Sequence, residues 1–150
     1  MFVKINGEQH YLWRVVDHEG EVLESFATKT RNKKSALRFL KKTMKRYGSA
    51  SVFVTDKLRS YGAALKEIGA ADRQETGRWM NNRAENSHLP FRRRECAMLR
   101  FRRMRSLQKF VAVHASVCNH FNSERSLSSR ARFKQNRAAA VAEWRELGSA

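Results

Sequence analysis

The chain has 150 residues, of which 41% are hydrophobic and only one is proline. This length and composition predict a single folded domain with a substantial core, and they exclude a disordered tail. Lysine and arginine total 31 against 14 aspartates and glutamates, which gives a formal net charge of +17. Such a surplus disfavours the compact state by self-repulsion, so we expect a polyanionic partner, with nucleic acid as the leading candidate.

The first 28 residues carry the pattern of three antiparallel strands joined by tight turns. FVKI leads into Asn6-Gly7, the strongest two-residue hairpin signal, and QHYLWRVVD leads out of it. A second turn over residues 18–20 then leads into EVLESFAT, which is again typical of a strand.

Helices and strands alternate after these strands. Apolar residues recur at helical spacing over 32–47, and Gly48 is expected to end that helix. SVFVT at 51–55 predicts a short buried strand, parallel to its predecessor because a helix connects the two. A second helix is expected to end at Gly69, and residues 70–80 leave room for one more short strand.

The remainder of the chain has a helical pattern from Asn82 to about 122, with Pro90 expected to bend or restart the helix. The polar stretch SERSLSSR (123–130) separates this region from a last helix over 131–147. The order of elements predicts an α/β (α+β) mixed sheet with helices on its faces, of which the ribonuclease H type of sheet is one example. We expect a core domain over residues 1–122 and a basic helical tail over 123–150.

Two carboxylates are candidates for chemistry. Asp56 directly follows the expected strand, where ligand sites of α/β folds gather. Asp also caps helices, and spacing alone favours that role by about two to one. Asn82 and Glu85 have the spacing of a capping box, which explains Glu85 without catalysis. If both carboxylates face the same space instead, they are suited to hold Mg²⁺ or Mn²⁺ for chemistry on DNA phosphates.

Residues 92–109 hold eight cations against one acidic residue, Glu95. Like charges repel along a helix, and arginine suits bidentate phosphate contacts, so a DNA-backbone surface is favoured over plain solvation by about three to one. The cations of this arginine surface are Arg92, Arg93, Arg94, Arg100, Arg102, Arg103, Arg105 and Lys109. Such contacts give affinity rather than sequence readout. Six cations of the helix over 32–47 are expected to extend the surface: Lys33, Lys34, Lys41, Lys42, Lys45 and Arg46.

The remaining polar and aromatic candidates are open to more than one interpretation. His88 lies one turn from Glu85 and is suited to assist at a phosphate, although a lone histidine near a helix start is more often structural. His114 lies on an apolar stripe and is expected in the core. Trp13 and Trp79 are expected to pack, with base stacking as the alternative for Trp79.

A membrane partner, disulfides and zinc are not expected. No apolar run reaches the ~20 residues of a transmembrane helix, and the start lacks the apolar core of a signal peptide. Cys96 and Cys118 have no CxxC spacing, so we expect them to be reduced and buried, as in a cytoplasmic protein. Two distant cysteines and scattered histidines match no zinc-ligand pattern.

Four stretches of the sequence resemble the DDE transposases of bacterial insertion sequences, in the group named after insertion sequence six. They are YLWRVVDHEGEVLE, VTDKLRSYGAALKE, NNRAENSHLPFRRRE and FRRMRSLQKFVAVHASVCNHFN, and the resemblance runs from Met1 to about Phe121. It implies a ribonuclease H-like fold and an Asp, Asp, Glu set that binds divalent metal. By motif, it implies that Asp56 is the second Asp and Glu85 is the Glu, which overturns the preference for a cap at Asp56.

The same resemblance places further motif residues around the metal or the strand ends. These residues are Lys57, Arg59, Tyr61, Asn82, Arg83, Asn86 and His88. Lys57, Arg59, Arg83 and His88 are expected to contact DNA together with the arginine surface.

The sequence departs from the family pattern at its start. In similar transposases the first catalytic Asp belongs to an Asp-Glu pair immediately before a segment like MFVKINGEQHYLWR, which here would precede Met1. Asp17 is a poor substitute, because it lies several residues beyond the position paired with that Asp. The resemblance therefore implies a C-terminal part of a transposase, with weak Mg²⁺ or Mn²⁺ binding, no strand transfer alone and marginal stability.

Three functions follow from these observations. The first is a transposase catalytic domain that binds transposon ends and target DNA but is defective in chemistry alone. The second is a non-enzymatic DNA-binding remnant that regulates or inhibits a full-length transposase, with a second copy of the chain as another expected partner. An RNA-binding protein is less favoured, because no aromatic motif of the RRM type is present.

Overall fold

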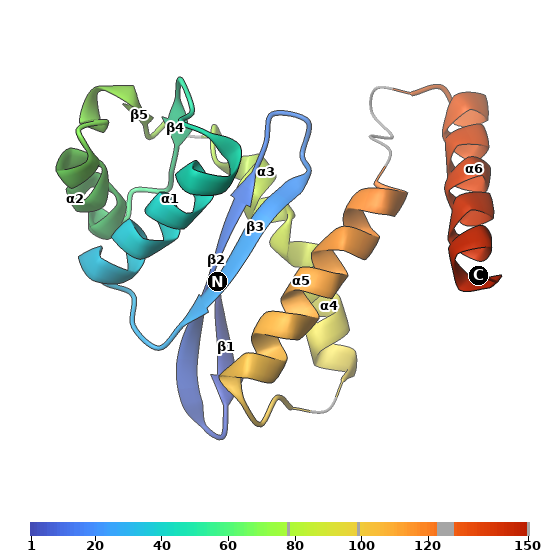
Figure 1. Cartoon of the computed structure of the whole chain (residues 1–150), viewed down its shortest axis with the longest axis horizontal. Coiled ribbons are helices and arrows are strands. Elements are labelled where there is room, and N and C mark those ends of the chain that lie inside the picture. Colours follow the sequence, from blue (N-terminus) through green and yellow to red (C-terminus); the bar gives the residue numbers. More distant parts are fainter. Residues whose placement is uncertain (78, 99, 123–127, 150) are drawn as a thin grey trace.

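The computed structural model of the protein describes residues 1–77, 79–98, 100–122 and 128–149. The first three strands form an antiparallel sheet, in the order β1 (Phe2–Ile5), β2 (Glu8–Val16) and β3 (Val22–Thr28). Asn6 and Gly7 join β1 to β2 with φ angles of 51° and 83°, because a type I′ turn requires positive φ at both positions. The three expected strands are confirmed, and Figure 1 shows them in blue at the centre of the molecule.

The first helix, α1 (Lys33–Tyr47), has the ends that its sequence predicts. Asn32 is the N-cap, and its side chain accepts a hydrogen bond from the Ser35 amide. Gly48 follows the last turn with a φ of 83° and donates its amide to the Met44 carbonyl. A residue with a Cβ would be strained there, which explains why the helix ends at this glycine.

The next strand is shorter than expected, since β4 covers only Phe53–Val54. It is followed by α2 (Arg59–Ile68) and a short 3₁₀ turn (Ala71–Arg73). That turn leads into β5 (Gln74–Glu75), which pairs with β4 in parallel and fills the region left open for one more strand. The prediction of one mixed sheet is wrong for the pairing: within the described residues β4 and β5 form a separate two-stranded sheet.

The helical region after residue 80 is divided into α3 (Asn82–Asn86), α4 (His88–Ala97) and α5 (Met104–Phe121). The predicted restart is confirmed, because Pro90 lies in the first turn of α4, where a missing amide costs no intrahelical hydrogen bond. The last helix, α6 (Arg130–Ser149), lies beside the end of α5 in Figure 1. The predicted polar break falls largely on residues 123–127, outside the described residues.

Helices cover the two faces of the β1–β3 sheet as separate layers (Figure 1). Neighbouring residues of a strand point to opposite faces, so Leu12 and Trp13 enter different cores. Leu12 packs with Phe91 of α4 and Val111 of α5, in what we call the α4–α5 layer. Trp13 packs with Phe39 of α1 and residues of α2, in the α1–α2 layer.

The cysteines and tryptophans differ in how far they are exposed. Cys96 is exposed rather than buried, because it lies on the outer side of α4, whereas Cys118 is half-buried, and both are free thiols. Trp79 is 69% exposed, so the expectation of core packing is wrong for it, whereas Trp13 is only 4% exposed. Among the described helices, none is long and apolar enough to cross a membrane.

Candidate functional site

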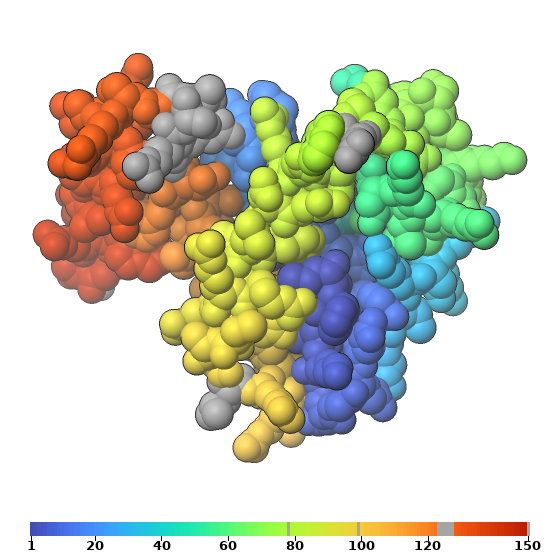
Figure 2. All heavy atoms as spheres, turned by 180° about the vertical axis from the view of Figure 1, so that it is seen from behind, coloured from blue at the N-terminus to red at the C-terminus, as the bar shows by residue number. Residues whose placement is uncertain are grey.

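The two candidate carboxylates line the same cavity. This cavity has a volume of about 840 Å³ and is walled by the end of β2, the segment around β4, part of α1 and α3. Asp56 enters it from the loop after β4, and Glu85 enters it from α3. Figure 2 shows this side of the molecule, with α3 and α4 running beside the N-terminal strands. Segments far apart in the sequence therefore bring both acids to one space.

Asp56 is held by its own loop and by a cation. One carboxylate oxygen accepts the Leu58 amide at 3.2 Å, which makes a local turn just before α2. The other oxygen pairs with the Arg31 guanidinium at 3.0 Å. The N-cap of α2 is Leu58 rather than Asp56, so the helix-capping interpretation is wrong in that form. Since 36% of the Asp56 side chain is exposed, its pair with Arg31 is open to water and to competing cations.

The carboxylate of Glu85 is open to the cavity. The predicted capping box is wrong, because the N-cap of α3 is Asn81, one residue earlier than expected. The Asn81 carbonyl accepts the Glu85 amide at 3.1 Å, while the Asn81 side chain donates to the Glu85 carboxylate at 3.5 Å. Glu85 is exposed and makes no ion pair within the described residues. Its carboxylate is therefore available to a ligand in the cavity.

The donor chemistry of this cavity suits a hard divalent cation, but the donors are few. Carboxylate oxygens are the ligands that Mg²⁺ prefers. Within the described residues, no three His, Cys, Asp or Glu side chains come together as a metal cluster. Asp17 also lines the cavity, but its Oδ1 accepts the Glu19 and Glu21 amides within its own turn, and Arg31 already pairs with Asp56.

Arg14 is a buried cation that the sequence analysis missed. It is 7% exposed, its Nε donates to the Ser25 hydroxyl at 3.2 Å, and one terminal nitrogen donates to the Ser87 carbonyl. The other nitrogen, Nη2, is buried and has no hydrogen-bond partner in the part of the chain that the structure describes. Burial lowers the pKa of Arg14 to about 10, so it remains charged at neutral pH. The signal was present in the alternation of β2, which places this arginine on the same face as Leu12.

His88 lies in the wall of the cavity near Arg14. Burial, followed by the charge of Arg14, lowers the pKa of His88 to about 3. The imidazole is therefore neutral at physiological pH, and its Nδ1 is buried without a hydrogen-bond partner among the described residues. A neutral ring with a free nitrogen is suited to a hydrogen bond with a ligand rather than to a charge pair.

Several predicted DNA-contacting residues lie around the cavity or close to it. Lys57 and Arg59 are exposed directly after Asp56. Arg83 is exposed, lines the cavity and donates to the His18 carbonyl. The motif residue Tyr61 also lines the cavity, where it packs edge-on against Trp13 at 5.3 Å, and burial raises its pKa. Tyr61 therefore belongs to the core that supports the site.

The sequence pattern suggested that the arginine surface lies along one helix, but the structure divides it among several segments. It spans the end of α4, the connecting segment and the start of α5. Arg92 is used internally, because it pairs with Glu95 and donates to the Phe2 carbonyl at 2.7 Å. The other described arginines of this surface are exposed: Arg93, Arg94, Arg100, Arg102, Arg103 and Arg105.

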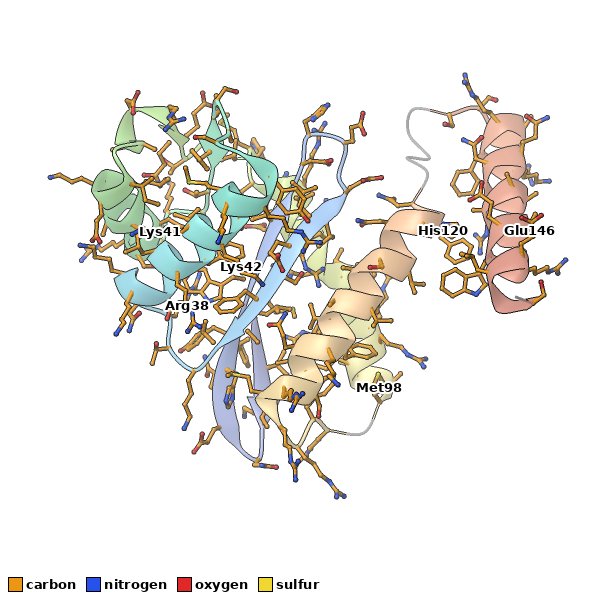
Figure 3. The ribbon with its side chains drawn as sticks, in the orientation of Figure 1. Arg38, Lys41, Lys42, Met98, His120 and Glu146 are labelled. Carbon is orange, nitrogen blue, oxygen red and sulfur yellow. The ribbon has the colours of Figure 1, made fainter. Side chains whose placement is uncertain are left out.

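The basic residues of α1 belong to a different surface. Figure 3 labels Arg38, Lys41 and Lys42 on α1, well away from Met98 at the end of α4. Because α1 and α4 cover opposite faces of the sheet, the α1 cations cannot continue the arginine surface without a break. His114, as expected, is at the core edge, where its ring lies 5.8 Å from the Phe91 ring.

Comparison with known proteins agrees with this architecture. A family model described as a DDE domain matches residues 1–124. The transposase of the insertion sequence-like element IS431mec of Staphylococcus aureus is 32% identical over 92 residues, which are 58% of this chain and 41% of that protein. The transposase of IS257 in transposon Tn4003, from the same species, gives the same values.

A third relative is an uncharacterised protein of Yersinia pseudotuberculosis, pYV0051, which is 31% identical over 71 residues, 45% of this chain and 66% of that protein. No solved structure matches the chain significantly. The chain aligns with about two fifths of the length of the transposases that it matches. The DDE domain is ribonuclease H-like, in keeping with a small sheet that is covered by helices on both faces. Since the family model spans most of its length, the chain belongs to the DDE-domain family of insertion-sequence transposases.

Proposed function

We propose that this chain provides two of the three catalytic carboxylates of a DDE transposase and binds DNA for cleavage and strand transfer. The observation that carries the proposal is the shared cavity, into which Asp56 and Glu85 come from separate elements. Exposed cations at Lys57, Arg59 and Arg83 lie at or next to these acids. They would attract and orient DNA phosphates without reading the base sequence.

Each group has a role that follows from its environment. Asp56 and Glu85 are the residues that would hold Mg²⁺ or Mn²⁺, which supplies Lewis-acid stabilisation of the reacting phosphate when bound. Arg31 keeps the Asp56 carboxylate turned toward the cavity. With these two acids as the metal ligands, we expect weak metal binding and no strand transfer by the 150-residue chain alone.

The test is a nicking assay on DNA with Mg²⁺ or Mn²⁺, using the chain with and without an added Asp-Glu pair before Met1. We expect activity only in the extended protein. There, Asp56→Asn and Glu85→Gln should each lower the rate at least roughly 100-fold, beyond the usual effect of a residue that only supports a ligand. Asp72→Asn, at an exposed acid outside the cavity, is the matched control. Unchanged nicking by both cavity variants would refute the metal-site assignment.

A second candidate function is a DNA-binding regulator that occupies transposon ends or pairs with a full-length transposase. It is supported by the exposed arginine surface and by the ion pair that neutralises Asp56. Because its partner is DNA, we place the protein in the cytoplasm in either case. The two functions differ in one result, since only the first requires any metal-dependent nicking by the extended protein.

DNA binding itself is tested by its salt dependence. The logarithm of affinity should fall with the logarithm of salt concentration by about 0.9 per phosphate contact. Arg93→Ala with Arg94→Ala should reduce that slope by up to about 1.8. Lys41→Ala with Lys45→Ala, on α1 in the other layer, is the control and should change the slope less. Equal slopes for wild type and the arginine variant would remove these arginines from the interface.

We further propose that residues 1–122 are the catalytic core and that 123–150 form an appended basic tail. In support, no residue of α6 is buried. Among the described residues, it contacts the end of α5, where Trp144 packs against Phe121 at 5.7 Å and His120 bonds to the Ala140 carbonyl at 2.8 Å. A chain ending at residue 122 should therefore unfold with the same midpoint as the whole chain.

A further inference from the structure

Helix α6 carries most of its positive charge on one side. Four of its cations follow one another at steps of four, three and eight residues: Arg130, Lys134, Arg137 and Arg145. With 3.6 residues per turn, these steps keep all four within an arc of about 80°. The two glutamates of the helix, Glu143 and Glu146, fall on the opposite side. We call the four cations the α6 stripe.

The α6 stripe has no counter-charge in the part of the chain that the structure describes. All four side chains are exposed, and none of them forms an ion pair there. They line one hollow of about 680 Å³, together with Phe133 and Val141. Like charges three and four residues apart destabilise a helix. An anion bound along the stripe would therefore stabilise α6.

The apolar side of α6 is already in contact with α5. The Trp144 ring lies 5.6 Å from the His120 ring and 5.7 Å from the Phe121 ring, and His120 Nε2 donates to the Ala140 carbonyl at 2.8 Å. Figure 3 shows Glu146 on the far side of α6 from His120. A helix that binds a membrane surface inserts its apolar side, so α6 would have to leave α5 to do so. A second copy of the stripe would be repelled by its like charge.

Duplex DNA fits the α6 stripe in both length and charge. Arg130 and Arg145 are 15 residues apart, so the stripe is about 22 Å long. That length covers roughly six base pairs of B-DNA, along which the phosphates present a continuous negative charge. Gln135 and Asn136, the side chains of α6 that are best suited to read bases, lie off the stripe. The stripe is therefore suited to contact the backbone without reading sequence.

We propose that the α6 stripe binds the phosphate backbone of duplex DNA, independently of base sequence. The family model ends at residue 124, so this surface lies outside the matched DDE domain. It is also separate from the arginine surface, because α6 contacts the end of α5 whereas the arginines lie near its start. The inference takes DNA as the partner from the proposed function, but it uses neither Asp56 nor Glu85 and requires no metal.

The test measures binding of a fluorescent duplex by anisotropy, without divalent metal and over a range of salt concentrations. The stripe variant combines Arg130→Gln, Lys134→Gln, Arg137→Gln and Arg145→Gln, because glutamine preserves helix formation. The slope of log affinity against log salt should become smaller by at least about 1.8 and by up to about 3.6, at about 0.9 per phosphate contact. The change should be the same for two duplexes of unrelated sequence. A wild-type slope in the stripe variant would refute the proposal.

The matched control removes the same net charge from another surface. Four exposed cations of α1 also recur at helical spacing: Lys34, Arg38, Lys41 and Lys45. Replacing these four with glutamine should change the slope by less than about 0.9, the share of one contact. Equal changes in the two variants would show that DNA responds to the total charge of the protein rather than to the stripe, and would overturn the proposal.

A second variant tests whether the stripe must be helical. Ala139→Pro keeps every charge but interrupts α6 between Arg137 and Arg145. Circular dichroism should show a loss of helix, and the salt slope should become smaller by at least about 0.9, because Arg145 is no longer aligned with the other cations. An unchanged slope despite the lost helix would mean that the cations act as a flexible charged tail, which would refute the stripe.

Two comparisons separate this inference from the alternatives. If Arg93→Ala with Arg94→Ala reduces the slope in the same assay but the stripe variant does not, the stripe is refuted while the proposed function stands. If wild type binds no duplex at all, both fail. Vesicles of phosphatidylcholine and phosphatidylserine test the membrane alternative. A stripe variant that loses vesicle binding but binds DNA as wild type does would assign α6 to an anionic membrane and overturn the proposal.

Discussion

The α1–α2 layer and the α4–α5 layer are both basic, yet they treat their charges differently. On α1, Lys33 pairs with Glu67 at 2.6 Å, and Lys42 and Arg46 both reach Glu24 at 3.4 Å. In the α4–α5 layer most arginines are exposed without an ion pair among the described residues. Within the described residues, three of the seven α1 cations have an acidic partner, whereas the arginines of the second layer are mostly left for a binding partner.

The start of α5 makes this contrast sharper. Its N-cap is Arg103, with no side-chain capping bond, although the first turns of α5 and α1 alike contain no acidic residue. Cations at the positive end of a helix dipole are unfavourable unless an anion binds there. In α1 the N-cap is Asn32, which does bond to the backbone. The N-terminus of α5 is therefore less stable on its own, and a bound phosphate would stabilise it.

The largest expected effects come from the cores, where the two layers should behave alike. Phe39 and Phe91 are 1% and 0% exposed, one in each layer. Replacing either with alanine should lower the free energy of unfolding by about 3–5 kcal/mol, because each leaves a cavity. Urea denaturation measures this loss. A much smaller loss for Phe91→Ala would mean that the α4–α5 layer is loosely packed.

The next effect is a loss of stability in acid, which we expect from His88 of α4. Because the pKa of His88 is about 3 in the folded protein and near its ordinary 6.5 when unfolded, the unfolded state takes up a proton first as the pH falls. Stability is therefore full above about pH 6.5 and is lost progressively toward pH 3, by roughly 2–3 kcal/mol at pH 4 after allowance for partial exposure.

Thermal melting between pH 7 and pH 4 tests this dependence. His88→Asn should be less sensitive to acid than wild type. His18→Asn, at a side chain that is 87% exposed, is the matched control and should keep the wild-type loss. If His88→Asn and wild type lose stability in parallel, the buried imidazole is not the group that responds.

The smallest effect concerns the ion pairs of the α1–α2 layer. Glu24 is 9% exposed and faces two cations, so Glu24→Gln should cost about 1 kcal/mol, measured by urea denaturation. Lys33→Ala breaks an exposed pair and should cost less than about 0.5 kcal/mol. The reverse order would mean that burial does not decide the value of these pairs.

Local signals in the sequence were enough to predict most of the elements. Asn6-Gly7, Gly48 and Gly69 each require a backbone conformation that few other residues adopt, and each ends an element where expected. Pro90 predicted the restart of the helix for a related reason, its missing amide. Such signals act over a few residues and do not depend on the rest of the fold.

The features that sequence reasoning missed depend on tertiary structure. The pairing of β4 with β5, in a sheet separate from β2, cannot be seen in SVFVT. The environment of Arg14 depends on Ser25 and Ser87, which are distant in the sequence. Likewise, only the meeting of the β4 loop with α3 shows that Asp56 and Glu85 share a cavity.

The alternation of Leu12 and Trp13 between the two cores has a consequence for how this sequence tolerates change. A single residue inserted into β2 ahead of Leu12 would exchange the two sides of the strand, so Trp13 would face α5 and Arg14 would face α1. Deletions and insertions in this strand should therefore be far more damaging than substitutions. An inserted tag or label belongs in the exposed turn at His18 and Glu19, where it leaves both faces in place.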